Sequence, residues 1–234
     1  MILTGRRADV LDELAAEVSG RAMACDLSSR SDVERIAGEA VGAELDVFVA
    51  NAALPASGVL TELTPEQIDR MLEVNLRAPI ALARAIAPGM IERGRGHMVF
   101  VSSLSGKAAS PSSSMYSATK FGLRGFALGL REDLQPHGIG VSTILPGFIR
   151  GAGMFAESGA TLPRGVGTRT PEQVAAAVLT AIERNRAELE VAPAGLRIGA
   201  AIAQVAPQTA ARFSRLMGGA KIADELAAGQ IDKR

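Results

Sequence analysis

Short apolar runs alternate with longer amphipathic segments along most of the chain. Runs of strand length lie at residues 22–25, 45–50, 98–101, 141–145 and 189–192, and residues 1–5 have the pattern of the end of a buried strand. Between these runs, apolar residues recur at helical spacing, as at Val10, Leu11, Leu14 and Val18. Strands that alternate with helices of this length predict an α/β fold, in which a doubly wound parallel sheet carries helices on both faces.

Helices are expected at residues 9–18, 31–41, 65 to about 88, 114–134, 171–184 and 196–233. Thr64-Pro65 and Thr170-Pro171 each place a capping hydroxyl before a proline suited to the first helical position. Pro88-Gly89 predicts the end of the third helix. The glycine-rich segment 148–168 is expected to be a mobile loop beside the site. No repeat or linker divides residues 1–234, so we expect a single domain with a helical tail from residue 196.

Composition and charge narrow the class of protein. The chain is 47% hydrophobic and 21% charged, with 25 basic and 25 acidic residues, which gives no sign of nucleic-acid binding. The single cysteine, Cys25, excludes an intrachain disulfide and is expected in the core. His97 and His137 look like surface or turn residues without partners, so no metal site is expected. No apolar run reaches the ~18 residues of a membrane span, and a cytoplasmic location is expected.

Polar and small residues follow the predicted strands at the edge where a doubly wound sheet binds its ligands. They are Gly5-Arg6-Arg7, Asp26-Leu27, Asn51-Ala52-Ala53, Ser102-Ser103 and Pro146-Gly147. The helix that follows Ser103 opens with Tyr116 and Lys120, which are four residues apart and share one helix face. A hydroxyl, a phenol and a cation around one point suit the reduction of a carbonyl or the oxidation of an alcohol.

Elementary acid–base chemistry assigns a role to each of these three groups. A free tyrosine has a pKa of about 10, and a nearby ammonium group favours the phenolate and lowers that pKa. Tyr116 is therefore the expected acid and base, and Ser103 the expected hydrogen-bond donor to the substrate oxygen. The alternatives are that Tyr116 is an ordinary amphipathic helix residue and Ser103 a capping serine; we favour the catalytic interpretation for both.

Five markers together resemble the short-chain dehydrogenase/reductase family over nearly the whole chain. They are Asn51-Ala52-Ala53, Asn75, Ser103, Tyr116-Ser117-Ala118-Thr119-Lys120 and Pro146-Gly147. The resemblance implies a nicotinamide-dependent oxidoreductase with a Rossmann-like sheet that acts on a small carbonyl or alcohol as a homodimer or homotetramer.

The resemblance also implies roles for single residues. Lys120 would hold the nicotinamide ribose, and Asn75 would hold a water that relays protons to Lys120, although Asn75 could instead satisfy helix backbone. The remaining positions would line the cofactor. Asp26 and Leu27 would flank the adenine, the Ile149 backbone would meet the carboxamide, and Asn51, Ala52, Ala53, Pro146 and Gly147 would lie alongside.

Cofactor choice follows from the end of the first strand. Relatives that prefer NAD place an acid there, whereas this chain has Gly5 followed by Arg6 and Arg7. A guanidinium suits a 2′-phosphate, so NADP(H) is favoured over NAD(H), with Arg6 the stronger candidate. The alternative is an ordinary solvated arginine pair at the start of a helix.

The chain departs from the family in two places. The family's first strand and glycine-rich phosphate turn are missing, and the strands of Leu3 and Val47 would then lack their common neighbour. Either the working protein begins about thirty residues earlier, which we favour, or the given chain is a fragment that binds cofactor poorly. In addition, Gly151 stands where relatives have a cofactor-binding threonine.

The sequence is compatible with three functions. The favoured one is an NADP(H)-dependent oxidoreductase, and the second is a non-catalytic interaction subunit that keeps the scaffold. The third is docking on a membrane surface through residues 196–216, where Arg197, Arg212 and Arg215 accompany apolar residues. Packing of that segment against the site or against a dimer partner is favoured over the membrane.

Overall fold

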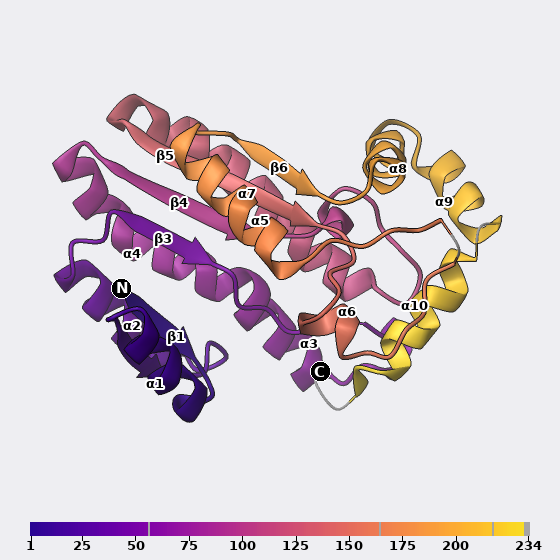
Figure 1. The fold of residues 1–234 in the computed structure, drawn as a ribbon, viewed down its shortest axis with the longest axis horizontal. Helices are drawn as coiled ribbons and strands as arrows, with labels where there is room; N and C mark the ends of the chain where they lie inside the picture. The colour runs from indigo at the N-terminus through magenta and orange to yellow at the C-terminus, as the bar shows by residue number, and fades with distance from the viewer. Residues whose placement is uncertain (56, 164, 217, 232–234) are drawn as a thin grey trace.

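The computed structural model describes residues 1–231 apart from 56, 164 and 217, and it has the predicted α/β architecture (Figure 1). Its six strands all pair in parallel, in two sheets. The first sheet has the order β1-β2, and the second has the order β3-β4-β5-β6. The strands are β1 (Ile2–Gly5), β2 (Arg21–Ala24), β3 (Val47–Ala50), β4 (Gly96–Val101), β5 (Ile139–Pro146) and β6 (Glu188–Val191).

Helices cover both faces of the four-stranded sheet, as predicted. Helices α4 and α5 pack on one face with α2 outside α4, and α7 packs on the other (Figure 1). The helices up to α5 are α1 (Ala8–Glu17), α2 (Arg30–Gly42), α3 (Pro65–Leu72), α4 (Ala78–Arg93) and α5 (Ser114–Leu134). The remaining helices are α6 (Gly153–Ala156), α7 (Pro171–Glu183), α8 (Ala194–Val205), α9 (Pro207–Leu216) and α10 (Gly219–Ala228).

Strand β4 forms the centre of the core. Met98, Val99 and Phe100 are all 0% exposed, and because strand side chains alternate, Val99 packs under α7 while its two neighbours face α4 and α5. Phe100 makes edge-to-face contacts with Phe48 and Phe126, with ring centroids 6.1 and 5.6 Å apart. Cys25 packs in the same cluster, as predicted.

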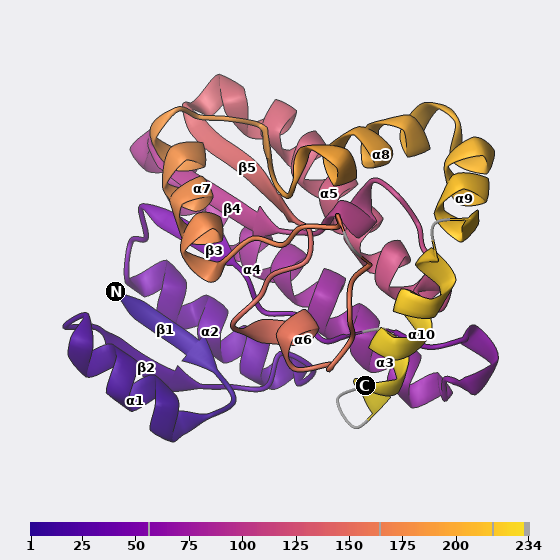
Figure 2. The same ribbon diagram turned by 45° about the vertical axis from the view of Figure 1, so that its right-hand side comes forward.

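The sheet is interrupted between β1 and β3. Within the described residues, β1 pairs only with β2 and β3 only with β4, and Val47 and Val49 of β3 are 41% and 42% exposed. The expectation of a buried first strand is therefore wrong, because the residues of β1 are half-buried or exposed and no described strand pairs with its other edge. The unit β1-β2 is attached instead through α2, whose Val33 and Ile36 join the cluster around α4 (Figure 2).

The predicted break at Pro88 is also wrong. Helix α4 continues through Pro88 to Arg93 and ends at Gly94, whose φ of 64° is the left-handed conformation that glycine favours. An interior proline costs ~3 kcal/mol or more, but Ile86 and Met90 on either side are 4% and 0% exposed and hold the helix in place. The helix is instead modified earlier, by a π-helical turn at Glu73–Arg77 between α3 and α4.

The tail is helical, as predicted, and consists of three helices that arch around the end of the sheet where β4 and β5 terminate (Figure 2). Pro207 starts α9 directly after α8, where a proline cannot continue the preceding helix. Segment 148–168 contains the short helix α6 in addition to loop. Within the described residues, no helix is both long and apolar enough to cross a membrane.

His97 is buried, contrary to the expectation that it lies at the surface. It is 7% exposed on β4, and its Nε2 lies 2.8 Å from the Ser142 hydroxyl, which in turn donates to the Arg186 carbonyl at 2.6 Å. Burial lowers the pKa of His97, and the nearby Arg131 guanidinium lowers it further. Folding therefore favours neutral His97.

We predict that His97 makes the protein less stable as pH falls. Above the ordinary histidine pKa of about 6.5 both states are neutral, whereas below it the unfolded chain binds a proton that the folded chain resists. The free energy of unfolding should fall between pH 7.5 and 5.5, by at most about 1.4 kcal/mol per pH unit for this one group. Urea denaturation should show a shallower pH dependence in His97→Asn, and an unchanged one in the exposed control His137→Asn. Equal slopes for wild type and His97→Asn would contradict the assignment.

Candidate active site

The strand ends bring nearly all the predicted site residues to one cavity of about 2940 Å³. It lies where the carboxyl ends of parallel strands meet, the usual ligand position in such sheets. The predicted residues that line it are Arg6, Arg7, Asp26, Leu27, Asn51, Ala52, Ala53, Ser103, Tyr116, Lys120, Pro146, Gly147 and Ile149. Asn75 does not line the cavity, and it is treated separately below.

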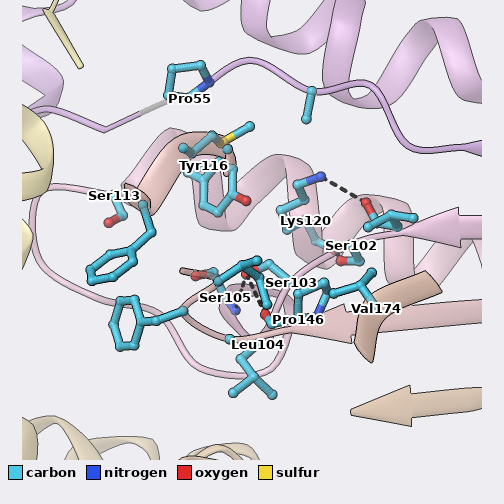
Figure 3. Close-up of a pocket in the computed structure, with 18 of the residues that line it drawn as sticks. Pro55, Ser102, Ser103, Leu104, Ser105, Ser113, Tyr116, Lys120, Pro146 and Val174 are labelled. Atoms are coloured by element: carbon cyan, nitrogen blue, oxygen red, sulfur yellow. Dashed lines mark hydrogen bonds between the residues drawn. The ribbon is translucent and has the colours of Figure 1, made fainter. Parts of the chain in front are cut away.

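Ser103 and Tyr116 face the cavity from different elements (Figure 3). Ser103 follows β4, and its Oγ accepts a hydrogen bond from the Ser105 amide at 3.1 Å and makes a long one, 3.5 Å, to the Pro146 carbonyl. Tyr116 lies in the first turn of α5. Burial raises the pKa of Tyr116, and hydrogen bonding with Ser103 acts in the opposite direction. The two hydroxyls are therefore within reach of one substrate oxygen.

Lys120 lies one turn further along α5 and is 2% exposed. Its Nζ donates to the Val101 carbonyl at 3.0 Å and lies 5.6 Å from the centre of the Tyr116 ring. Burial lowers the pKa of Lys120 to about 8. Burial is the larger influence on the phenol and raises its pKa, and the lowering expected from Lys120 stays a prediction.

Asn75 lies in the π-helical turn and is 1% exposed. Its Oδ1 accepts from the Leu54 amide at 2.7 Å, and its Nδ2 donates to the Leu54 carbonyl at 2.9 Å and to Thr119 Oγ1 at 3.4 Å. Asn75 thus holds the segment after β3 against α5. The sequence suggested that it could satisfy backbone of its own helix, whereas the backbone it satisfies belongs to a distant segment.

The cations predicted for a cofactor phosphate lie at the opposite end of the cavity. Arg6 and Arg7 follow β1 with exposed side chains. Asp26 accepts hydrogen bonds from the Ser28 amide and hydroxyl, which lower its pKa, and Arg70 and Arg6 lower that pKa further. Asp26 is therefore a charged turn residue close to the guanidinium groups of Arg6 and Arg70.

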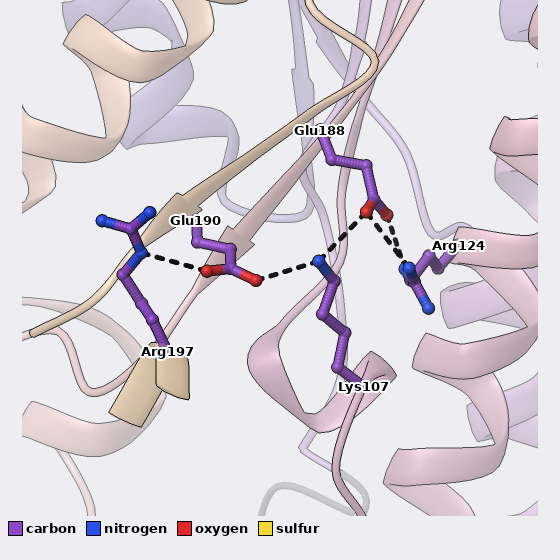
Figure 4. Close-up of polar contacts among 5 residues, drawn as sticks. All are labelled: Lys107, Arg124, Glu188, Glu190 and Arg197. Atoms are coloured by element: carbon purple, nitrogen blue, oxygen red, sulfur yellow. Dashed lines mark hydrogen bonds and ion pairs between the residues drawn. The ribbon is translucent and has the colours of Figure 1, made fainter. Parts of the chain in front are cut away.

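Sequence inspection missed an ion network on the other side of Ser103 (Figure 4). Lys107 Nζ lies 3.0 Å from Glu188 and 2.9 Å from Glu190, while Arg124 pairs with Glu188 and Arg197 with Glu190. The two carboxylates are two residues apart on β6 and so share one face of the strand, which was the available sequence signal.

The network connects the loop after Ser103 to the edge strand and to α8. Burial alone would raise the pKa of Glu188 and Glu190, but hydrogen bonds from Arg124, Lys107 and Arg197 prevail and lower both values. The side chain of Lys107 is only 10% exposed, and its positive charge is balanced there by the carboxylates of Glu188 and Glu190.

Comparison with known proteins agrees with this geometry. A family model described as short chain dehydrogenase matches residues 1–163. The parallel sheets with helices on both faces of the larger one, and a cavity lined by a serine that follows β4 and by a tyrosine and a lysine of α5, define a Rossmann-like α/β protein. The chain belongs to the short-chain dehydrogenase/reductase family.

Two curated relatives show how similar in sequence the chain is to known proteins of the family. The chain is 30% identical over 179 residues to the ketoacyl reductase HetN of Nostoc sp., an alignment that covers 74% of this chain and 62% of that protein. It is 28% identical over 215 residues to dehydrogenase/reductase SDR family member 7B of Bos taurus, covering 82% of this chain and 65% of that protein. The chain thus spans less than two thirds of the length of both relatives.

Solved structures share the fold over more of the chain. A short-chain dehydrogenase from Streptomyces avermitilis superposes with a TM-score of 0.77 at 25% identity, covering 93% of this chain and 88% of that one. One from Sphingobium yanoikuyae, in complex with NADPH, gives 0.73 at 26% identity and covers 94% and 83%.

We predict that Lys107→Met destabilises the protein. Removal of the ammonium leaves Glu188 and Glu190 close together and partly buried, which should cost up to about 3 kcal/mol, near the low end for a broken buried ion pair. The control Arg95→Met breaks an exposed pair with Asp46 and should cost less than about 1 kcal/mol. Urea denaturation measures both, and equal losses would argue against a structural role for the network.

Proposed function

We propose that the protein is an NADP(H)-dependent oxidoreductase that interconverts a carbonyl and an alcohol, with Tyr116 as acid and base. The observation that carries this proposal is that Ser103, Tyr116 and Lys120 line one cavity from β4 and α5. The NADPH-bound relative supports the cofactor class. As part of the proposal, inferred from the family resemblance, the protein works as a cytoplasmic homodimer or homotetramer.

When bound, the nicotinamide supplies or accepts the hydride, and the chain's own residues handle the oxygen and its proton. In reduction, the Tyr116 hydroxyl donates its proton to the oxygen that gains negative charge. The Ser103 hydroxyl lies beside Tyr116 and donates only a long, 3.5 Å hydrogen bond to the Pro146 carbonyl, so it would turn and donate to the same oxygen. The Lys120 ammonium, 5.6 Å from the Tyr116 ring, then stabilises the phenolate that remains.

Tyr116→Phe tests this role directly. The variant lacks the transferable proton, and loss of a general acid should lower kcat by about 10²–10⁴-fold. Steady-state oxidation and reduction with a panel of secondary alcohols and ketones provides the measurement, with urea denaturation to verify the fold. The control is Arg84→Lys, a conservative change at an exposed residue of α4 that is not among the residues lining the cavity. If wild type turns over no carbonyl or alcohol, or if Tyr116→Phe keeps full turnover, the proposal is wrong.

Preference for NADP(H) is proposed on the basis of Arg6. The residues at hand suit such a cofactor in part: guanidinium groups at one end of the cavity, small Ala52 and Ala53 between, and the buried cation Lys120 near the reacting centre. Arg6 would hold the 2′-phosphate, and Asp26 and Leu27 the adenine. Ile149 pairs with Arg169 beside the site, so its backbone is fixed where the carboxamide would bind.

Arg6→Ala should weaken NADPH binding by at least tenfold and leave NADH binding unchanged, because only NADPH carries the extra phosphate. Fluorescence titration of each reduced cofactor measures both affinities. The exposed and distant Arg95→Ala serves as control. An equal loss for both cofactors would contradict a role for Arg6 in the choice between them.

The interruption between β1 and β3 motivates a further part of the proposal. Within the described residues β1 pairs only with β2 and β3 only with β4, and we propose that one more parallel strand with a glycine-rich turn lies between β1 and β3, as in the family. A chain extended by such a unit should bind NADPH more tightly than residues 1–234 alone in the same titration. Equal binding by both forms would disprove this part. Failure of both to bind would favour the second candidate, a non-catalytic interaction subunit, which the exposed β3 valines also support.

A further inference from the structure

We propose, on the basis of the proposed function, that the substrate is an uncharged ketone or secondary alcohol with an extended apolar group. The group would occupy the part of the cavity next to the tail helices, which we call the distal chamber. Its wall consists of Met154, Phe155, Leu196, Ile222, Ala223 and Leu226. These side chains come from α6, α8 and α10, which lie near the end of the sheet where β4 and β5 terminate (Figure 2).

The wall is a fixed surface because α10 is held by polar contacts from three directions. Gln230, which follows α10 and is 4% exposed, accepts from Ser57 Oγ at 2.7 Å and donates to the Met154 carbonyl at 3.1 Å. Asp224 accepts from Ser112 Oγ at 3.0 Å. Helix α10 is thereby attached to the segments that follow β3, β4 and β5, which are the segments around the catalytic hydroxyls.

The face that α10 turns to the cavity is apolar. Ile222, Ala223 and Leu226 line it at helical spacing, whereas Asp224 and Glu225 between them make polar contacts elsewhere. On the opposite side the Phe148 and Phe155 rings pack with centroids 5.0 Å apart. An apolar lining in the same cavity as Ser103 and Tyr116 favours an apolar substituent on the substrate.

The charges around the cavity exclude an anionic substituent from this chamber. Arg6, Arg7 and Arg70 lie at the other end, near Asp26. Lys107 and Arg124 are paired with Glu188 and Glu190, and Lys120 donates to the Val101 carbonyl beside Tyr116. Among described lining residues from 148 onward, Glu157 alone is charged, and it would repel an anion. A carboxylate or phosphate in the chamber would be desolvated without a counter-ion, which is costly.

A substrate series tests the inference in the wild-type protein. Because each buried methylene contributes about 0.8 kcal/mol, kcat/KM should rise by about fourfold per methylene from 2-butanone to 2-octanone. The matched anion 7-oxooctanoate should react at least 100-fold less efficiently than 2-octanone. A flat series, or equal efficiency for the two eight-carbon ketones, would overturn the proposal.

A variant that supplies the missing cation sharpens the test. Leu226→Arg should raise the efficiency ratio of 7-oxooctanoate to 2-octanone by at least tenfold, because a guanidinium then faces the chamber. The matched control Leu216→Arg adds the same charge at a site that is 85% exposed and outside the cavity lining, and it should leave the ratio unchanged. An equal increase in both variants would show a general charge effect and contradict the assignment.

Binding without turnover separates this inference from the proposed function. Titration calorimetry on Tyr116→Phe should show at least tenfold tighter binding of 2-octanol than of octanoate. The same preference in a protein that turns over no ketone would support the chamber and contradict the oxidoreductase proposal. Turnover of small ketones with no preference for 2-octanol over octanoate would support the enzyme and contradict the chamber.

Discussion

The relative position of Ser103 and Tyr116 depends on the contact between the end of β4 and the first half of α5. Ser102 Oγ donates to the Lys120 carbonyl at 2.9 Å, and Lys120 Nζ donates back to the Val101 carbonyl at 3.0 Å. Gly106 allows this close approach, because a Cβ there would lie 2.8 Å from the Lys120 carbonyl oxygen. The two elements that carry Ser103 and Tyr116 are thus joined by buried hydrogen bonds, so the distance between the two hydroxyls is fixed by the fold.

Three further polar side chains hold the segments around this contact in place. Asn75 holds the segment after β3, Lys107 holds the loop after Ser103, and Gln230 holds the tail. Each is a buried or nearly buried polar side chain that contacts elements far away in the sequence. Polar groups at such positions are costly unless satisfied, so their pairing favours a single arrangement of the loops around the cavity.

Local pattern was sufficient for most elements, since the period of apolar residues and capping pairs such as Thr170-Pro171 predicted them within a few residues. The errors arose where tertiary packing decides the outcome. Packing around Ile86 and Met90 carries α4 through Pro88, and the core accommodates His97 through Ser142. Lys107 contacts Glu190, about eighty positions further along the chain, and a single sequence gives no indication that these two residues meet. The Tyr116 pKa depends on burial, which spacing alone does not supply.

The four-stranded sheet and the β1-β2 unit are held together by different means. The sheet β3-β4-β5-β6 is joined by backbone hydrogen bonds, whereas β1-β2 is held chiefly by the packing of α2 on α4 and by surface pairs such as Arg30 with Glu73. Helix packing is less directional than strand pairing and leaves the backbone edges of β1 and β3 unpaired. A strand between them would form two new ladders without breaking a sheet hydrogen bond. The extra strand proposed above would therefore require no change at Ser103, Tyr116 and Lys120.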